Sequence, residues 1–329
     1  MTSAALLAEF RARRPAALAR AISIVENRRP GFEAILAALY PSTGRARRIG
    51  VTGPPGAGKS TLTAQLTSAW RAAGHTVGIV AVDPTSPYTG GALLGDRIRM
   101  EAVALDDGVY IRSLATRGAG GGMSAAAADA ADVLDAFGFD RVIIETVGVG
   151  QSELDVAQAT DSCLLVLVPE SGDAIQALKA GLMEVADLFV VNKADRPGAD
   201  QIRRDIEFTL RLRAAPAAAV PRAPAPWTPP VLATAAVTGT GIADVLGALD
   251  AHYAYLFETG SLAERRRARL QARVVDIVDR RMRERMWEDA AATTWLAGQL
   301  DALAARETTP FAVADALLAR PGGLGRRTP

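Results

Sequence analysis

Short apolar runs alternate with longer stretches of helical periodicity through the middle of the chain. The apolar runs are Ile49–Thr52, Val77–Val82, Tyr110–Ile111, Val142–Ile144, Cys163–Val168, Leu188–Val191 and Val231–Leu232. Runs this short and continuous are typical of strands buried on both faces, and the helical stretches between them are typical of crossover connections. The pattern predicts an α/β fold with a mostly parallel central sheet, whose ligands bind at the carboxyl ends of the strands.

Helical periodicity also fills both ends of the chain. Before the first strand, Leu18, Ile22 and Val25 share one helix face. After Phe257, hydrophobic residues recur at helical spacing: Leu270, Val274, Ile277, Val278 and Met282. We predict an N-terminal helical extension over 1–45, the α/β domain over 46–256, and a C-terminal helical arm over 257–329 that ends in a disordered tail. The arm is expected to pack on itself or on another subunit.

Composition narrows the class of protein without indicating its chemistry. Of the 329 residues 49% are hydrophobic and 22% charged, and the net charge of +1 requires neither nucleic acid nor a membrane as a partner. Cys163 lies in an apolar run and is expected to be a buried thiol. With no disulfide framework, signal peptide or spanning segment in the sequence, the chain is expected in the cytoplasm. A transit peptide is a minor alternative, because several arginines lie among alanines near the N-terminus.

One glycine-rich segment stands between the first predicted strand and a predicted helix. It reads Gly53-Pro54-Pro55-Gly56-Ala57-Gly58-Lys59-Ser60 and is followed by Thr61. A strand, a glycine-rich turn and a helix in this order form a phosphate-binding P-loop, in which backbone N–H groups and the helix N-terminus face the phosphates. We expect Lys59 to reach the outer phosphates and the Ser60 hydroxyl to bind Mg²⁺.

A second motif, Asn192-Lys193-Ala194-Asp195, ends the strand Leu188–Val191 and predicts the identity of the base. The Asp195 carboxylate can accept hydrogen bonds from guanine N1–H and the 2-amino group, and Lys193 can lay its stem along the ring. Adenine has neither donor, so its binding would leave the carboxylate desolvated and unpaired. The motif therefore favours guanine over adenine.

Carboxylates near three other strand ends are candidates for holding Mg²⁺. Asp83 follows the second strand, Asp96 follows a glycine-containing segment, and Glu145 ends the fourth strand. Each can bind the ion directly or through its waters; for Asp96 an ordinary turn residue is an almost equal alternative. After Glu145, Gly148 is expected to sense the γ-phosphate, and Gln151 either orients water or simply begins a helix.

Lysine is rare in this chain, and its positions are informative. Of 37 basic residues only Lys59, Lys179 and Lys193 are lysines, and two of these lie in nucleotide-binding motifs. Lys179 is therefore a candidate functional residue, with an ordinary surface lysine as the equal alternative.

Together these motifs resemble one family over residues 15–318. The segments that carry the resemblance are Pro54–Ser60, Val82–Pro87, Thr89–Arg97, Ala115–Gly118, Glu145–Glu153 and Asn192–Asp195. They look like the MeaB/ArgK family, the methylmalonyl-CoA mutase-associated G proteins. The resemblance implies a homodimeric GTPase that binds GTP or GDP with Mg²⁺ and acts as a chaperone of an adenosylcobalamin-dependent acyl-CoA mutase. It would gate the loading of the cofactor onto that mutase and protect the enzyme from inactivation.

The resemblance also implies roles for particular residues. Phosphate, Mg²⁺ and switch functions fall on Lys59, Ser60, Asp83, Asp96 and Glu145, and guanine recognition falls on Asn192 and Asp195. An additional switch loop corresponds to Glu170–Lys179, which includes Asp173, and the dimer contact corresponds to the C-terminal arm. The base-contacting loop departs from the family pattern, because Ala235-Ala236-Val237 lacks the usual serine. The Ala236 backbone N–H is expected to meet guanine O6 instead.

Three other functions compete with this interpretation. A nickel-inserting GTPase would need more metal ligands than one cysteine, His75 and His252. A P-loop kinase or ATPase would share the phosphate loop but would prefer ATP. A regulatory module could hold GTP without significant turnover until a partner completes the site.

Overall fold

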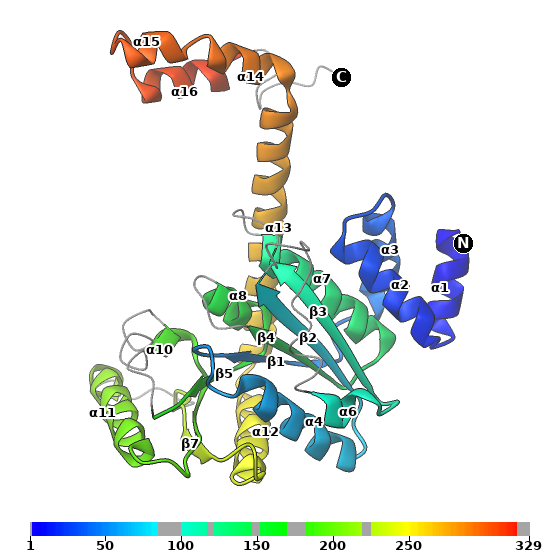
Figure 1. Cartoon of the computed structure of the whole chain (residues 1–329), viewed down its shortest axis with the longest axis vertical. Coiled ribbons are helices and arrows are strands. Elements are labelled where there is room, and N and C mark those ends of the chain that lie inside the picture. Colours follow the sequence, from blue (N-terminus) through cyan, green and yellow to red (C-terminus); the bar gives the residue numbers. More distant parts are fainter. Residues whose placement is uncertain are drawn as a thin grey trace. The chain divides into compact units, whose positions relative to one another are not determined.

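A seven-stranded parallel sheet forms the centre of residues 1–266 (Figure 1). The computed structural model describes residues 2–84, 100–116, 122–146, 152–169, 182–218 and 225–320. The strands are β1 (Arg47–Thr52), β2 (Val77–Pro84), β3 (Val109–Thr116), β4 (Arg141–Thr146), β5 (Ser162–Leu167), β6 (Leu188–Asn192) and β7 (Val231–Thr234). Their order is β3-β2-β4-β1-β5-β6-β7, and every neighbouring pair is parallel. Each predicted apolar run is a strand, so the predicted fold class is confirmed.

Helices cover both faces of this sheet, which is why its central strands are continuously apolar. They are α4 (Lys59–Ala72), α6 (Glu101–Ala104), α7 (Gly122–Phe137), α8 (Ser152–Ala159), α10 (Leu182–Val185), α11 (Ala199–Ala218) and α12 (Ile242–Glu258). One core joins α4, α6 and α12 to β1, β2, β4, β5 and β6. On the other face α7 and α8 pack on β2 and β4, and α10 and α11 pack on β5 and β6.

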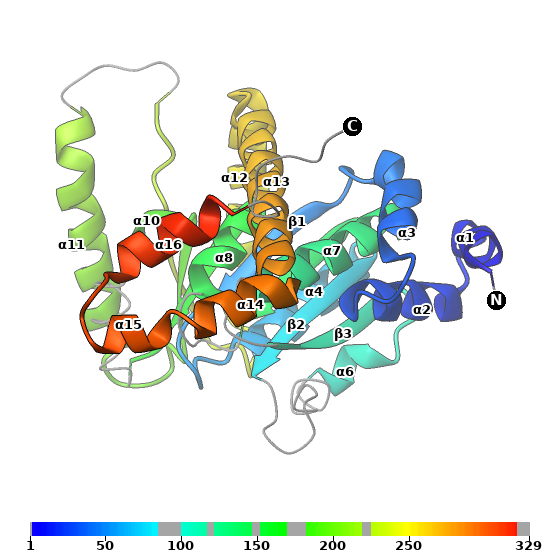
Figure 2. The same ribbon diagram turned by 90° about the horizontal axis from the view of Figure 1, so that it is seen from above.

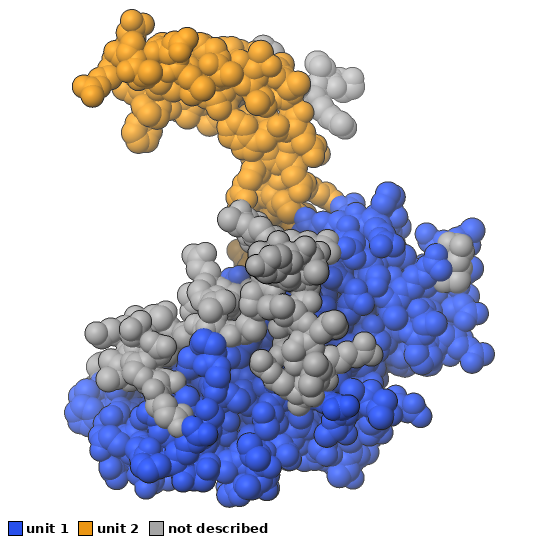
Figure 3. All heavy atoms as spheres, in the orientation of Figure 1, with its two compact units in different colours: residues 1–266 blue, residues 267–329 orange. Residues whose placement is uncertain are grey.

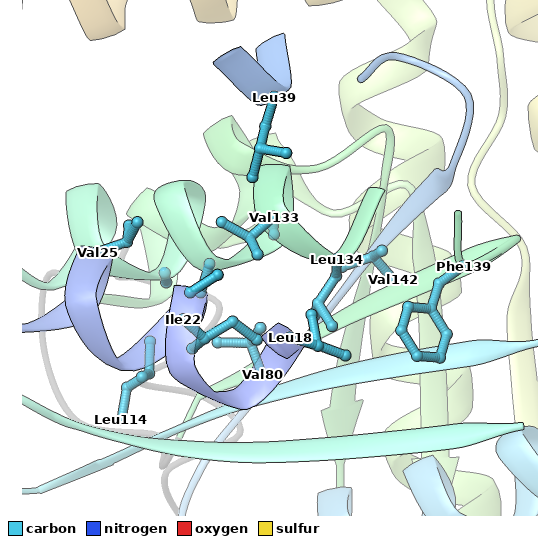
Figure 4. Close-up of a cluster of buried hydrophobic side chains, with 14 of the residues drawn as sticks. Leu18, Ile22, Val25, Leu39, Val80, Leu114, Val133, Leu134, Phe139 and Val142 are labelled. Carbon is cyan, nitrogen blue, oxygen red and sulfur yellow. The ribbon is translucent and has the colours of Figure 1, made fainter. Parts of the chain in front are cut away.

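The N-terminal helices extend the core beyond α7. They are α1 (Ser3–Arg11), α2 (Pro15–Glu26) and α3 (Phe32–Leu39), followed by a short 3₁₀ turn at Tyr40–Ser42. Figure 2 shows α2 beside α7. In Figure 4, Leu18 and Ile22 of α2 point toward Leu134 of α7 and Val80 of β2. The apolar face predicted from Leu18, Ile22 and Val25 is thus buried against the sheet domain.

Two local features differ from the sequence-based expectation. β3 is longer than Tyr110–Ile111, because it lies at the edge of the sheet, where partly exposed polar residues extend the strand. The proline-rich sequence Pro216–Pro230 predicts an extended connector, but α11 continues through Pro216 to Ala218.

The chain divides into two compact units, residues 1–266 and 267–329 (Figure 3). The division falls within α13 (Ser261–Glu288), which is followed by α14 (Ala290–Ala297), α15 (Leu300–Ala304) and α16 (Pro310–Leu318). In the second unit α14 packs against α16. Several apolar residues of α13 are exposed: Leu270, Val274, Val275, Val278 and Met282.

Two smaller observations concern the thiol and the membrane. Cys163 is buried as predicted, and burial raises the pKa of its thiol, which therefore stays protonated. None of the helices within the described residues is both long and apolar enough to cross a bilayer.

Candidate functional site

The glycine-rich segment forms a tight loop between β1 and α4 that only glycine can build at two positions. Gly53 has φ +137°, and a Cβ there would lie 2.0 Å from the Val166 carbonyl oxygen. Gly58 has φ +84° and caps the N-terminus of α4, and a Cβ there would lie 2.4 Å from Asn192 Nδ2. The loop therefore packs its backbone directly against β5 and β6.

Lys59 directs its ammonium group back over this loop. It is 6% exposed, and Nζ donates to the carbonyl oxygens of Gly53 at 2.8 Å and Pro54 at 2.9 Å. Lys59 is also the first residue of α4, so its charge adds to the positive end of the helix dipole. A buried cation beside a helix N-terminus forms a binding site for an anion such as phosphate.

Ser60 and Glu145 meet beside the loop. The Ser60 hydroxyl donates to Glu145 Oε1 at 2.6 Å, and Glu145 is 3% exposed. The parallel pairing of Val51 with Glu145 brings the carboxylate there, because β4 runs directly beside β1. One hydroxyl and one carboxylate are hard oxygen ligands of the kind that Mg²⁺ prefers, so the donor set fits this ion.

Other predicted metal and switch residues are placed only in part. Asp83 is the penultimate residue of β2, two residues beyond Ala81, which pairs with Glu145, so its backbone lies at the same edge of the sheet. Asp96, Gly148, Gln151, Asp173 and Lys179 lie outside the described residues. Within the part of the chain that is described, no three His, Cys, Asp or Glu side chains gather to hold a metal ion.

Asn192 connects the phosphate loop to the loop that follows β7. Its Nδ2 donates to the Ala57 carbonyl at 2.8 Å, while its Oδ1 accepts from the Thr234 hydroxyl and from the Ala236 N–H, both at 3.1 Å. The motif predicted that Asn192 binds the nucleotide, but only the structure shows that its amide links the P-loop to the loop after β7. Ala57 is 135 residues away in sequence, so no local pattern could reveal this contact.

The rest of the base-binding motif lies at the carboxyl end of β6. Lys193 adopts φ +56°, Asp195 is exposed, and the Ala194 N–H donates to the Thr234 carbonyl at 2.9 Å, which holds the turn beside β7. An exposed carboxylate next to a P-loop can reach a bound base. The Ala236 N–H donates to Asn192, so contact with guanine O6 would require that bond to be exchanged.

Two residues that the sequence analysis did not single out stand behind the loop. Thr52 at the end of β1 and Thr146 at the end of β4 share a hydrogen bond of 3.0 Å between their buried hydroxyls. The pair joins the start of the P-loop to the residue that follows Glu145. Threonine at a strand end is too common for the sequence alone to have indicated it.

The comparisons with known proteins agree with this geometry. The family model for methylmalonyl Co-A mutase-associated GTPase MeaB matches residues 18–291. A putative GTPase of Pyrococcus horikoshii is 48% identical over 262 residues, which cover 80% of this chain and 81% of that protein. The mitochondrial methylmalonic aciduria type A homolog of Mus musculus is 37% identical over 220 residues, which cover 67% of this chain and 52% of that protein.

A solved structure extends the likeness to the whole fold. The crystal structure titled as a LAO/AO transport system kinase has a TM-score of 0.70 and 28% sequence identity, and the match covers 96% of both chains. The family model spans most of the chain, and several relatives are named as GTPases. The chain therefore belongs to the MeaB family of methylmalonyl-CoA mutase-associated GTPases and hydrolyses GTP.

Proposed function

We propose that this GTPase is Mg²⁺-dependent and uses GTP binding and hydrolysis to gate adenosylcobalamin loading of a methylmalonyl-CoA mutase or a close relative, which it also protects. The observation that carries the chemistry is the meeting of Lys59, Ser60 and Glu145 at the carboxyl edge of the sheet. The family description, which names the mutase, supports the client. A cytoplasmic location suits a chain whose one cysteine is buried and forms no disulfide.

Each group in the site has a distinct task in this proposal. Lys59 would exchange its carbonyl partners for phosphate oxygens and neutralise the charge that develops on them. Ser60, Glu145, Asp83 and Asp96 would hold Mg²⁺, directly or through water. Held by these residues, the ion would supply positive charge that offsets the charge of the phosphates.

Recognition of the base falls to Asp195, Lys193 and the loop Ala235–Val237. The Asn192 amide holds this loop and the P-loop in a fixed relation, so the base and phosphate subsites are built as one unit. Gly148, Gln151, Asp173 and Lys179 are the residues that we assign to the switches.

Association of two copies is part of the proposal. Along α13, Leu270, Val274, Val278 and Met282 recur every fourth residue and are exposed. A continuous exposed apolar stripe on one helix is typical of a helix that packs against a partner. A second copy of this arm is the partner that the family resemblance implies.

The test is GTP turnover with and without the cobalamin-dependent mutase. We expect the purified mutase to stimulate hydrolysis by about tenfold or more, because partners often complete a slow GTPase site. Lys179→Ala should keep basal turnover and lose this stimulation, whereas Lys179→Arg, which preserves the charge, should retain part of it. Absence of stimulation by the mutase in the wild type would instead support a GTP-binding module without this client.

A further inference from the structure

Two buried aspartates stand at the amino ends of neighbouring strands, at the edge of the sheet opposite the P-loop. Asp161 immediately precedes β5 and Asp187 immediately precedes β6, and they are 1% and 7% exposed. The Arg48 N–H donates to Asp161 Oδ2 at 3.0 Å, and the Cys163 N–H donates to Asp187 Oδ2 at 2.9 Å. Both carboxylates are therefore built into the sheet edge.

Consecutive arginines in the first turns of α13 hold these two carboxylates. Arg266 donates from Nε and Nη2 to the two oxygens of Asp161 at 3.1 and 2.8 Å. Arg265 donates from Nη2 and Nη1 to the two oxygens of Asp187 at 2.8 and 3.0 Å. Because a two-point arginine–carboxylate pair fixes direction as well as distance, the start of α13 must follow both aspartates.

The same aspartates lie just beyond the two helices that follow the predicted switches. α8 begins directly after residues 147–151, the segment expected to sense the γ-phosphate, and ends at Ala159, two residues before Asp161. α10 begins directly after residues 170–181, which contain the expected additional switch, and ends at Val185, two residues before Asp187. Each predicted switch is thus linked to α13 by one short helix and one ion pair. The two links also touch, because Arg265 donates to the Asp161 carbonyl oxygen at 3.2 Å, and Arg266 donates to the carbonyl oxygens of Gly44 and Ala46 as well.

α8 is also packed tightly against the strand that leads into the P-loop. A Cβ on Gly50 of β1 would lie 2.7 Å from Val156 Cγ1 and 2.8 Å from the Thr160 hydroxyl, so no side chain fits between strand and helix. α8 contacts α10 as well. Close packing of this kind passes a displacement on to the neighbouring element instead of absorbing it.

We infer that Arg265 and Arg266 couple the nucleotide site to the first turns of α13, through Asp187 with α10 and through Asp161 with α8. The inference rests on the proposed nucleotide-dependent switch and adds the route by which it leaves the site. A change in α8 or α10 between the GDP and GTP states moves an aspartate, and the paired arginine moves with it. Linkage is reciprocal, so a perturbation of α13 also changes the relative affinity for the two nucleotides.

Hydrogen–deuterium exchange of the full chain tests this coupling. The protein is compared with GDP and with a non-hydrolysable GTP analogue, each with Mg²⁺, and uptake is followed in residues 152–160 and 261–275. We expect the nucleotide to change uptake in both segments of the wild type. In the double variant Arg265→Gln and Arg266→Gln, the difference in 152–160 should remain and the difference in 261–275 should disappear.

A matched control and a stability measurement separate coupling from damage. Arg267→Gln removes an exposed arginine next in sequence and should leave both differences intact. Thermal unfolding identifies a variant that no longer folds, and Arg266→Gln alone, which should reduce the difference in 261–275, then replaces the double variant. An unchanged response of 261–275 in the double variant overturns the coupling, as does a wild type in which only 152–160 responds. If nucleotide binds but neither segment responds, the proposed switch itself is wrong.

Discussion

At the scale of single residues, we assign to Lys59 the charge on which hydrolysis depends. Its ammonium is buried, donates to the carbonyl oxygens of Gly53 and Pro54 and lies at the N-terminus of α4, so it is positioned for an anion. We expect Lys59→Ala to lower kcat for GTP by about 100-fold or more, as removal of one preorganised charge from a transition state does. Steady-state phosphate release measures this, and Ser68→Ala, on the exposed face of the same helix, should behave as wild type. Hydrolysis retained by Lys59→Ala would remove the phosphate-binding assignment.

At Gly53 there is no room for a side chain, and the backbone conformation also favours glycine. A Cβ would collide with the Val166 carbonyl in addition to the strained φ, so Gly53→Ala should lower the free energy of unfolding by roughly 2–4 kcal/mol. Gly74 also has a positive φ, of +87°, but nothing lies within 4 Å of its Cβ, so Gly74→Ala should cost only about 1 kcal/mol. Urea unfolding without nucleotide compares them. Equal losses would mean that the contact with β5 relaxes freely.

At the scale of elements, the N-terminal helices are stabilised by their contact with α7 and the sheet. Ile22 of α2 is fully buried in this core. Ile22→Ala should therefore lower the free energy of unfolding by about 2–5 kcal/mol, which is the range for a large-to-small change in a packed core. Arg20→Ala, on the exposed face of the same helix, should stay within about 0.5 kcal/mol of wild type. If chemical denaturation shows no loss for Ile22→Ala, the N-terminal helices unfold separately from the sheet domain.

Elements that lie far apart in sequence meet at the P-loop. The loop follows β1, Glu145 lies in β4 and Asn192 ends β6. In the turn after β7, the Ala236 N–H donates to the amide oxygen of Asn192. Each element ends at the same edge because all seven strands are parallel. Parallel pairing, more than any single motif, thus concentrates the chemistry.

At the scale of the whole molecule, charge at the opposite edge of the sheet makes stability depend on pH. Burial would raise the pKa of Asp187, but hydrogen bonds and charge from His252 and Arg265 outweigh it and lower that pKa below its ordinary value of 3.8. Because the folded-state pKa is the lower one, the carboxylate stabilises the fold above about pH 4, and this contribution is lost as the pH falls through the folded-state pKa.

Asp187→Asn removes this titration. The variant should be less stable than wild type at neutral pH, because Arg265 loses its charged partner, and the difference should shrink between about pH 5 and about pH 3. Denaturation midpoints across this range measure the effect, with the exposed Asp200→Asn as a control that keeps the wild-type pH profile. A difference that stays constant down to about pH 3 would mean that the Asp187 charge contributes nothing.

The strands, the P-loop and the class of ligand could be predicted from the amino-acid sequence, because these features depend on neighbours along the chain. Continuous apolar runs required buried strands, and glycine spacing before Lys59 and Ser60 required a phosphate loop. The long motifs then sufficed to identify the family.

Contacts between groups far apart in sequence could be found only in the folded chain. The position of β1 between β4 and β5 brings Glu145 to Ser60, and the packing of β6 beside β5 brings Asn192 to Ala57. The ion pair between Arg265 and Asp187 joins residues 78 positions apart, and the ion pair between Arg266 and Asp161 joins residues 105 positions apart. Hydrogen bonds across such separations depend on strand order and helix placement, which local periodicity does not encode, so these contacts had to be seen in the folded chain.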